Sequence, residues 1–290
     1  MEYNRVQRVL IVILVLNLAV AAAKAVFGIL AASVSMVADS FHSAFDSASN
    51  IIGLISTEIA KRPPDGRHPY GHGKFESLGT LIIGGLLMLT AVGLLFEGIS
   101  RLQKGEIPSI SSLTIGVMAG TIVVNIIVAV IERRMGEQLQ SQILIADSEH
   151  TKSDVYVSLS VLAGFGFVMV GYPVADPLIA CGIALIIARM GIRILRAAGD
   201  VLTDAAMVDC EDDIRRIVRS IHGVHGYHKF RCRGKPGELF ADLHVFVDPA
   251  ISVEEGHAIA DHVRDRILAE IEGMDDVVVH VDPFTGQVSD

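Results

Sequence analysis

Two stretches of the chain carry the same spacing of acids and histidines within otherwise apolar sequence. Residues 38–46 and residues 146–154 both fit the pattern A-D-S-x-H-x-x-x-D. In a helix, a histidine and an aspartate four residues apart project from one face, one turn apart. His42 and Asp46 therefore form one predicted pair of ligating side chains, and His150 and Asp154 form a second.

Two such helices face to face would offer two imidazoles and two carboxylates to one ion. That donor set is typical of tetrahedral Zn²⁺, whereas Mg²⁺ and Ca²⁺ prefer oxygen ligands alone. A polar packing network or a proton relay without metal is the alternative interpretation, which the duplication of the pair disfavours. Asp39 and Asp147, three residues before each histidine, either orient the imidazoles or cap and pack locally.

The helices that hold these residues are predicted to cross a membrane. Hydrophobic residues make up 51% of the 290, and the mean hydropathy is +0.50. A membrane-spanning helix needs about 20 mostly apolar residues. A charge inside a bilayer costs roughly 2.5–3.5 kcal/mol on insertion scales, so the charged motifs indicate a functional site. Six stretches qualify as spans, and the second and fifth contain the motifs: Val6–Ala31, Ser33–Ala60, Phe75–Leu102, Ser111–Ile131, Ser141–Val170 and Pro177–Leu195.

The distribution of lysine and arginine predicts the orientation of the spans. The flanks on one side carry ten cations, and those on the other side carry only Arg101 and Lys104. Positive charge favours the cytoplasmic side. The sequence therefore predicts a multi-pass protein of the cell (cytoplasmic) membrane with both termini in the cytoplasm. The first apolar run is too long for a cleavable signal peptide and has no cleavage site after it.

Composition and missing motifs argue against several protein classes. A formal net charge of −9 disfavours nucleic acid as a partner. Three cysteines cannot staple a disulfide scaffold of this length. The chain has no G-x-x-x-x-G-K-[ST] for nucleotide-driven work and no H-E-x-x-H for an intramembrane metalloenzyme such as a protease. A membrane-tethered metal sensor is a further alternative, although a sensor has no need of ligands deep in a bilayer.

A shift in charge marks a second domain. Residues 208–290 carry 17 acidic and 9 basic residues, whereas residues 1–207 are nearly neutral. The tail reads as helix 210–221, strand 227–233, turn 234–237, strand 239–248, helix 253–271 and strand 277–281. This αββαβ order predicts a small ferredoxin-like α+β fold. The expected fold is a membrane domain of six transmembrane helices (residues 1–207) followed by an α+β cytoplasmic domain (residues 208–290).

The paired H-x-x-x-D motifs, the six spans and the small tail resemble the cation diffusion facilitator family along essentially the whole chain. Members of that family are homodimeric exporters of divalent metal ions that exchange the metal for protons. The resemblance implies a secondary active transporter rather than an enzyme, with its transport site at His42, Asp46, His150 and Asp154. It implies Zn²⁺ as the main substrate and Cd²⁺, Co²⁺, Fe²⁺ or Mn²⁺ as further candidates. The short link between the fourth and fifth spans resembles prokaryotic members.

Two further metal sites are expected outside the spans. Asp65, His68 and His72 lie within eight residues in the loop after the second span. They either hold a metal at the membrane surface, which the resemblance supports, or serve turn geometry. In the tail, two histidines fall on neighbouring predicted strands, and the last strand ends in a histidine and an aspartate on one face. The resemblance implies a regulatory zinc site there, with ordinary surface histidines as the alternative: His228, His244, His257, His280 and Asp282.

Overall fold

The computed structural model describes residues 2–30, 40–41, 43–44, 46–104, 112–172, 174–206 and 211–286. The chain divides into two compact units, Glu2–Gly199 and Asp200–Asp290, and each has its own hydrophobic core. The predicted domain boundary between residues 207 and 208 lies outside the described residues.

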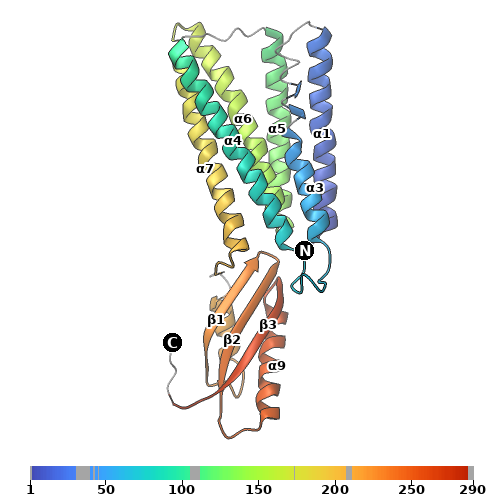
Figure 1. The fold of residues 1–290 in the computed structure, drawn as a ribbon, viewed down its shortest axis with the longest axis vertical. Coiled ribbons are helices and arrows are strands. Elements are labelled where there is room, and N and C mark those ends of the chain that lie inside the picture. The colour runs from blue at the N-terminus through green and yellow to red at the C-terminus, as the bar shows by residue number, and fades with distance from the viewer. Residues whose placement is uncertain are drawn as a thin grey trace. The chain divides into compact units, whose positions relative to one another are not determined.

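The first unit is a bundle of helices (Figure 1). All of its named helices except α3 are long and apolar enough to cross a membrane. They confirm the first, third, fourth, fifth and sixth predicted spans. The helix α3 is the described end of the second predicted span, part of which lies outside the described residues. The bounds are α1 (Tyr3–Leu30), α3 (Ala48–Ala60), α4 (Lys74–Lys104), α5 (Ser112–Gln138), α6 (Gln142–Met169) and α7 (Ala175–Leu202).

The outside of this bundle is apolar, as lipid contact requires. Leu89 and Phe96 on α4, for example, are about 70% exposed (69% and 70%). So much exposed apolar surface would favour aggregation in water, whereas acyl chains solvate it well. The inside is a second apolar layer in which Leu10, Ile83 and Ile143 are fully buried.

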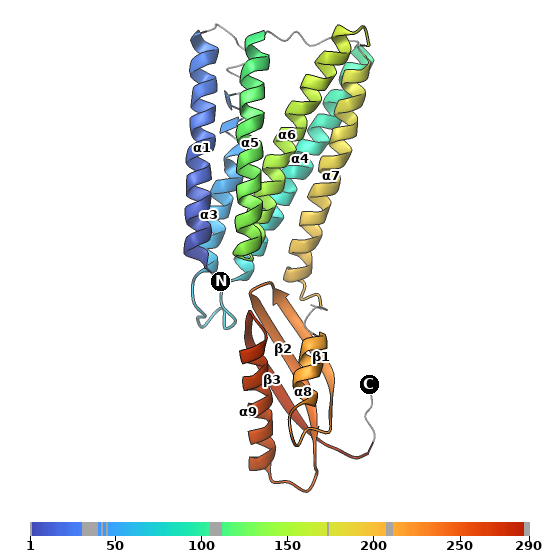
Figure 2. The ribbon, with the colours of Figure 1, turned by 180° about the vertical axis from the view of Figure 1, so that it is seen from behind.

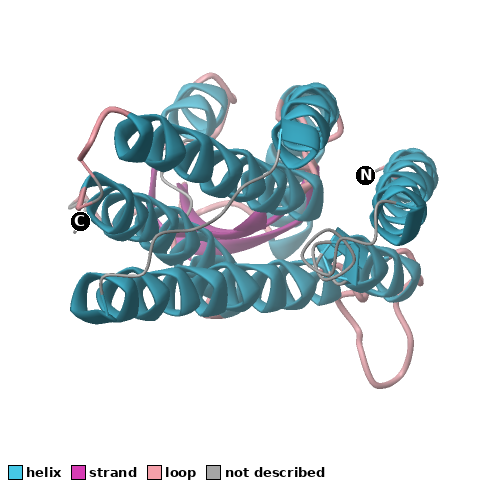
Figure 3. Ribbon diagram, turned by 90° about the horizontal axis from the view of Figure 1, so that it is seen from above, coloured by secondary structure: helices cyan, strands magenta, loops and turns pink. Residues whose placement is uncertain are grey.

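Packing in the bundle is close where side chains are small. The helix α3 packs against α1, α4 and α6, and α5 packs against α6 (Figures 1 and 2). Figure 3 shows the same helices from above. A Cβ atom on Gly79 of α4 would lie 2.2 Å from the Ser56 hydroxyl of α3. Only glycine fits there, as is common where membrane helices approach closely.

The helix α5 runs past the predicted end of the fourth span at Ile131 and continues to Gln138. Hydropathy falls at Glu132, but the backbone stays helical because this end of α5 packs against α6. A Cβ on Gly136 would meet the Ile145 side chain at 2.9 Å. Glu132 is therefore fully buried inside the bundle instead of marking the end of the helix.

The second unit contains a three-stranded sheet. Its elements are α8 (Glu211–Arg219), β1 (Gly226–Lys235), β2 (Glu238–Val247), α9 (Val253–Glu270) and β3 (Met274–Pro283). The strand order is β1-β2-β3, with β1 antiparallel and β3 parallel to β2. A hairpin followed by a helical crossover produces this arrangement. The predicted αββαβ order and α+β fold are confirmed.

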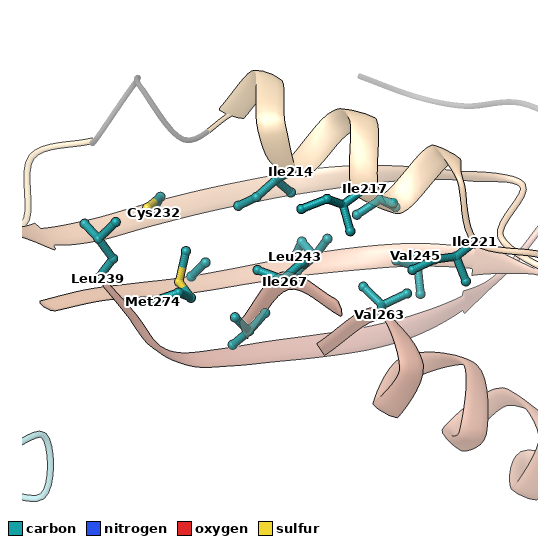
Figure 4. Close-up of a cluster of buried hydrophobic side chains, with 13 residues drawn as sticks. Ile214, Ile217, Ile221, Cys232, Leu239, Leu243, Val245, Val263, Ile267 and Met274 are labelled. Carbon is teal, nitrogen blue, oxygen red and sulfur yellow. The ribbon is translucent and has the colours of Figure 1, made fainter. Parts of the chain in front are cut away.

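One face of this sheet carries the core of the second unit. In β2, Leu239, Leu243 and Val245 are buried, whereas Asp242 and His244 between them are partly exposed. Apolar side chains from α8 and α9 complete the core (Figure 4). The alternation leaves the opposite face of the sheet for polar side chains, including histidines.

Candidate metal-binding sites

The first cluster joins α6 to the segment that precedes α3. Asp46, His150 and Asp154 each place a ligand atom within 4.8 Å of the others. His150 is 6% exposed, and neither of its ring nitrogens has a hydrogen-bond partner among the described residues. An unsatisfied buried polar group costs about 1–3 kcal/mol. Among the described residues the two ring nitrogens are therefore open to a further ligand, and one imidazole beside two carboxylates is a donor set that suits a divalent cation.

Two predicted residues of this region, His42 and Asp39, lie outside the described residues. The described part of the chain brings together three of the four predicted transport ligands. The part of His42 in the site stays a prediction.

The register between α3 and α6 explains why Asp46 meets the second motif. Gly53 of α3 faces Ile143 near the start of α6, where a Cβ on Gly53 would lie 3.4 Å from the Ile143 side chain. Asp46 lies seven residues before Gly53, and His150 lies seven residues after Ile143. Antiparallel helices with this register hold Asp46 and His150 at the same height. The start of α6 is accordingly recessed by about 10 Å from the end of α3 at Ala60, at 1.5 Å per residue.

Asp147 belongs to a polar network beside the cluster. It is 1% exposed and accepts a hydrogen bond from the Asn50 side-chain amide. Asn50 in turn accepts a hydrogen bond from Asn17 at 3.1 Å. These bonds link α1, α3 and α6 around the cluster. Of the two roles left open by the sequence, these bonds correspond to packing between helices, and the orienting of the imidazoles stays a prediction.

Glu132 was not expected from the motifs. Its carboxylate is fully buried and accepts a hydrogen bond from the Thr151 hydroxyl at 2.9 Å. Because Thr151 follows His150 in the chain, this bond braces the turn of α6 that carries the imidazole. Its signal in the sequence is an acid directly after Ile131, where the fourth span is predicted to end.

A cavity of about 520 Å³ adjoins the cluster, and α1, α4, α5 and α6 contribute to its walls. Asp46, His150 and Asp154 line it, together with Asn17 and Lys24 of α1. Lys24 is 6% exposed. Like Glu132, it is a buried charge that the motif did not indicate, although a lysine within an apolar span is as costly as an acid.

The loop between α3 and α4 holds the second cluster, where Asp65, His68 and His72 place ligand atoms within 4.8 Å of one another. Backbone N–H bonds from His68 (2.7 Å) and Arg67 (2.8 Å) lower the pKa of the Asp65 carboxyl. His72 Nδ1 lies 3.2 Å from the Pro63 carbonyl oxygen, and its Nε2 lies 3.5 Å from Asp65. With Nδ1 donating to the carbonyl, the Nε2 lone pair is available to a metal.

The third cluster is a row of histidines on the open face of the tail sheet. The strand register pairs His228 with His244, and His244 with His280. One carboxylate oxygen of Asp282 lies 2.9 Å from His228 Nε2 and 2.8 Å from His244 Nδ1. The other oxygen lies 3.3 Å from His280 Nε2. The structure thus brings ligand atoms of His228, His244 and Asp282 within 4.8 Å of one another, and His280 joins them through Asp282.

The hydrogen bonds with His244 and His228 lower the pKa of Asp282 from its ordinary 3.8 to about 2. A lowered carboxyl pKa means that the contribution of Asp282 to tail stability is present above about pH 3.8. That contribution is lost as the pH falls toward 2. Asp282 is therefore an anion at every physiological pH and remains ready to bind a cation.

His257 lies apart from this row. Its ring is 75% exposed, and its Nε2 lies 3.4 Å from Asp261, four residues later on α9. His257 and His280 both line a separate cavity of about 410 Å³. A role for His257 in a metal site stays a prediction.

Comparison with known proteins covers almost the whole chain. The model of the cation efflux transmembrane domain matches residues 10–203, and that of the cation efflux protein cytoplasmic domain matches residues 208–284. An uncharacterized transporter of Methanocaldococcus jannaschii is 32% identical over 280 residues, which cover 96% of this chain and 99% of that protein. The magnetosome protein MamB of Magnetospira sp. is 30% identical over 90% of this chain and 89% of its own length. The manganese efflux system protein MneP of Bacillus subtilis is 27% identical, with 96% of each chain covered.

Proposed function

This chain belongs to the cation efflux family, also called the cation diffusion facilitators, and we propose that it exports Zn²⁺ from the cytoplasm in exchange for protons. As a member of this family it is a multi-pass membrane transporter of divalent metal ions and not an enzyme. The choice of zinc, the exchange for protons and the outward direction are the proposed part.

The observation that carries this proposal is the cluster of Asp46, His150 and Asp154 beside a cavity of the bundle, in which His150 is buried and the two aspartates are partly buried. It offers one imidazole nitrogen and two carboxylate oxygens, and the sequence motif adds His42 as the expected fourth ligand. Two imidazoles with two carboxylates favour Zn²⁺, because harder ions such as Mn²⁺ prefer oxygen donors.

The proposed transporter is a homodimer in the cell membrane, with both termini and the tail in the cytoplasm. The asymmetry of lysine and arginine between the two sets of flanks supports this orientation. The match of residues 208–284 to a cytoplasmic domain supports the same side for the tail. Membership of the family supports the dimer.

Metal uptake into proteoliposomes tests the function. The purified chain is reconstituted, and initial rates are measured with Zn²⁺, Cd²⁺, Co²⁺, Fe²⁺ or Mn²⁺ as the added ion. We expect saturable uptake, with a higher kcat/KM for Zn²⁺ than for the other ions. Faster transport of Mn²⁺, the ion named in the relative MneP, would contradict the choice of zinc. Absence of uptake for every ion would refute the transport function.

The tail is proposed to sense cytoplasmic zinc and to set the export rate. Two tails in a dimer each carry a formal charge of −8, from 17 acidic and 9 basic residues, and therefore repel one another. Divalent ions at the row of His228, His244, His280 and Asp282 would offset part of this repulsion. His257 is proposed to add a ligand from α9. Closing the two tails would then favour a transport-ready arrangement of the membrane helices.

The isolated tail, residues 208–290, is expected to bind zinc and become more compact as a dimer. It retains its own hydrophobic core, so it can be studied alone by small-angle scattering or by distances between spin labels. His244→Ala combined with Asp282→Ala should weaken both binding and compaction, because Asp282 contacts three histidines of the row. His262→Ala, which changes an exposed histidine outside the row, is the control. Zinc binding without a change in dimer shape would refute the sensing role.

A further inference from the structure

Lys24 lies on the face of α1 that packs into the bundle. Val26 and Phe27 of the same helix are more than half exposed, whereas Lys24 is 6% exposed. Its side chain therefore does not extend to the membrane surface, as lysines in bilayers commonly do. The buried positions of α1 recur at the spacing of one helix face: Val6, Leu10, Ile13, Ala21, Lys24 and Gly28.

The ammonium group of Lys24 is directed toward the transport cluster. Its Nζ donates a hydrogen bond to the Ser43 hydroxyl at 2.8 Å. Ser43 lies three residues before Asp46, one helical turn away. Lys24, Ser43 and Asp46 line the same cavity as His150 and Asp154. The ammonium group is thus bonded one helical turn from Asp46, in the wall of the cavity that Asp154 also lines.

We propose that Lys24 is a tethered cation of the transport site, which pairs with its carboxylates when the metal is absent and gives way to the incoming ion. The inference rests on the proposed function, because it takes Asp46 and Asp154 as metal ligands. Two carboxylates close together inside a protein repel one another unless a cation accompanies them. Lys24 can supply that cation, because rotation of its flexible side chain would move the ammonium group from Ser43 toward Asp46, one helical turn away.

The same charge has the opposite effect once the metal is bound. A lysine ammonium a few ångströms from a divalent ion repels it, and the low dielectric of the bundle strengthens the repulsion. Lys24 therefore weakens metal binding and favours release. An exporter benefits from this compromise, since a site that held zinc too tightly would release it slowly. Lys24 acts as a positioning residue through the ligands and does not itself bind the metal.

The test compares KM and kcat for Zn²⁺ uptake by the full chain in proteoliposomes. Lys24→Met keeps the length of the side chain and removes its charge. Loss of the repulsion should lower KM by about tenfold or more, and slower release should lower kcat. Lys24→Arg keeps the charge and should restore both parameters. Lys152→Met is the matched control, because its ammonium pairs with Glu149 at 2.6 Å and it does not line the cavity.

The opposed changes in KM and kcat distinguish this role from packing. A lysine needed only for packing would give Lys24→Met a lower kcat with an unchanged or higher KM, and that outcome would overturn the inference. If the methionine variant does not fold, Lys24→Gln removes the charge and retains a polar group toward Ser43. Parental uptake with an unchanged KM in the neutral variants refutes the Lys24 inference alone. A parent chain that transports no metal refutes the proposed function and this inference with it.

Discussion

Replacing Asp154 with alanine is expected to lower the rate of zinc uptake into proteoliposomes by about 100-fold or more. Loss of a residue that only hydrogen-bonds a metal ligand already lowers metal affinity or activity by about 10–100-fold, and Asp154 is proposed as a ligand itself. Asp154 supplies one of two carboxylates in the described cluster with Asp46 and His150. The substitution removes a ligand atom and a negative charge from a cavity inside the bundle. Initial rates with an entrapped zinc-sensitive dye measure the effect.

Two companion variants separate this chemistry from general damage to the bundle. Asp154→Asn keeps the shape of the side chain and removes its charge, so it should also lose most of the uptake. Glu149→Ala changes an acid on the same helix whose carboxylate pairs with Lys152 at 2.6 Å and with Arg133 at 3.7 Å. It should transport at close to the parental rate. Parental uptake in a folded Asp154→Ala dimer would show that the site is assigned wrongly.

The elements of the fold were predictable because each leaves a periodic or compositional signal. The helix α6 (Gln142–Met169) agrees with the predicted span 141–170 to within one residue at each end, because apolar composition changes sharply there. The strand β2 is predicted from alternation, which its burial follows as far as Val245, whereas Phe246 and Val247 are both buried. The end of α5 was missed because hydropathy reports composition and not helicity. Arg133 and Glu137, which pair at 2.5 Å one turn apart, keep the helix intact beyond the apolar run.

The site was only partly predictable, because residue spacing identifies ligands but not the depth at which two helices meet. The meeting of Asp46 and His150 depends on the contact between Gly53 and Ile143, which no pattern within one helix reveals. Lys24 is an isolated charge in the apolar run that follows Arg5 and Arg8 on α1. Only the packing of α1 shows that it faces inward.

The row of tail histidines depends on an equally non-local feature. His228 and His244 could be assigned to neighbouring strands from the sequence, but the place of His280 beside them requires the parallel pairing of β2 with β3. Parallel pairing joins strands across a helical crossover, so its register is not set by a short turn. The same reasoning shows why His257 could not be placed, since the rotation of α9 against the sheet decides where its side chain lies.

An acid-inside pH gradient is expected to drive zinc into proteoliposomes against its concentration gradient. Metal and protons compete for the same lone pairs, so zinc binding requires the ligands to release protons. His150 has neither ring nitrogen bonded to a described residue, which leaves both nitrogens available to a proton or to the metal. When zinc leaves, Lys24 can offset one of the negative charges on Asp46 and Asp154. Protons must offset the remainder, because an unpaired charge in a bilayer is costly.

The size of the accumulation reports how many protons exchange for each zinc ion. With the membrane potential held at zero by valinomycin and potassium, every exchanged proton should raise the accumulation ratio about tenfold per pH unit. The slope of the logarithm of that ratio against the pH difference then gives the stoichiometry. Nigericin, which dissipates the pH gradient, should abolish accumulation while downhill movement of zinc continues. Asp154→Ala vesicles should show no accumulation at any gradient. A parental ratio that does not change with the pH difference would contradict proton exchange, because the same cluster would then serve only facilitated diffusion of the metal.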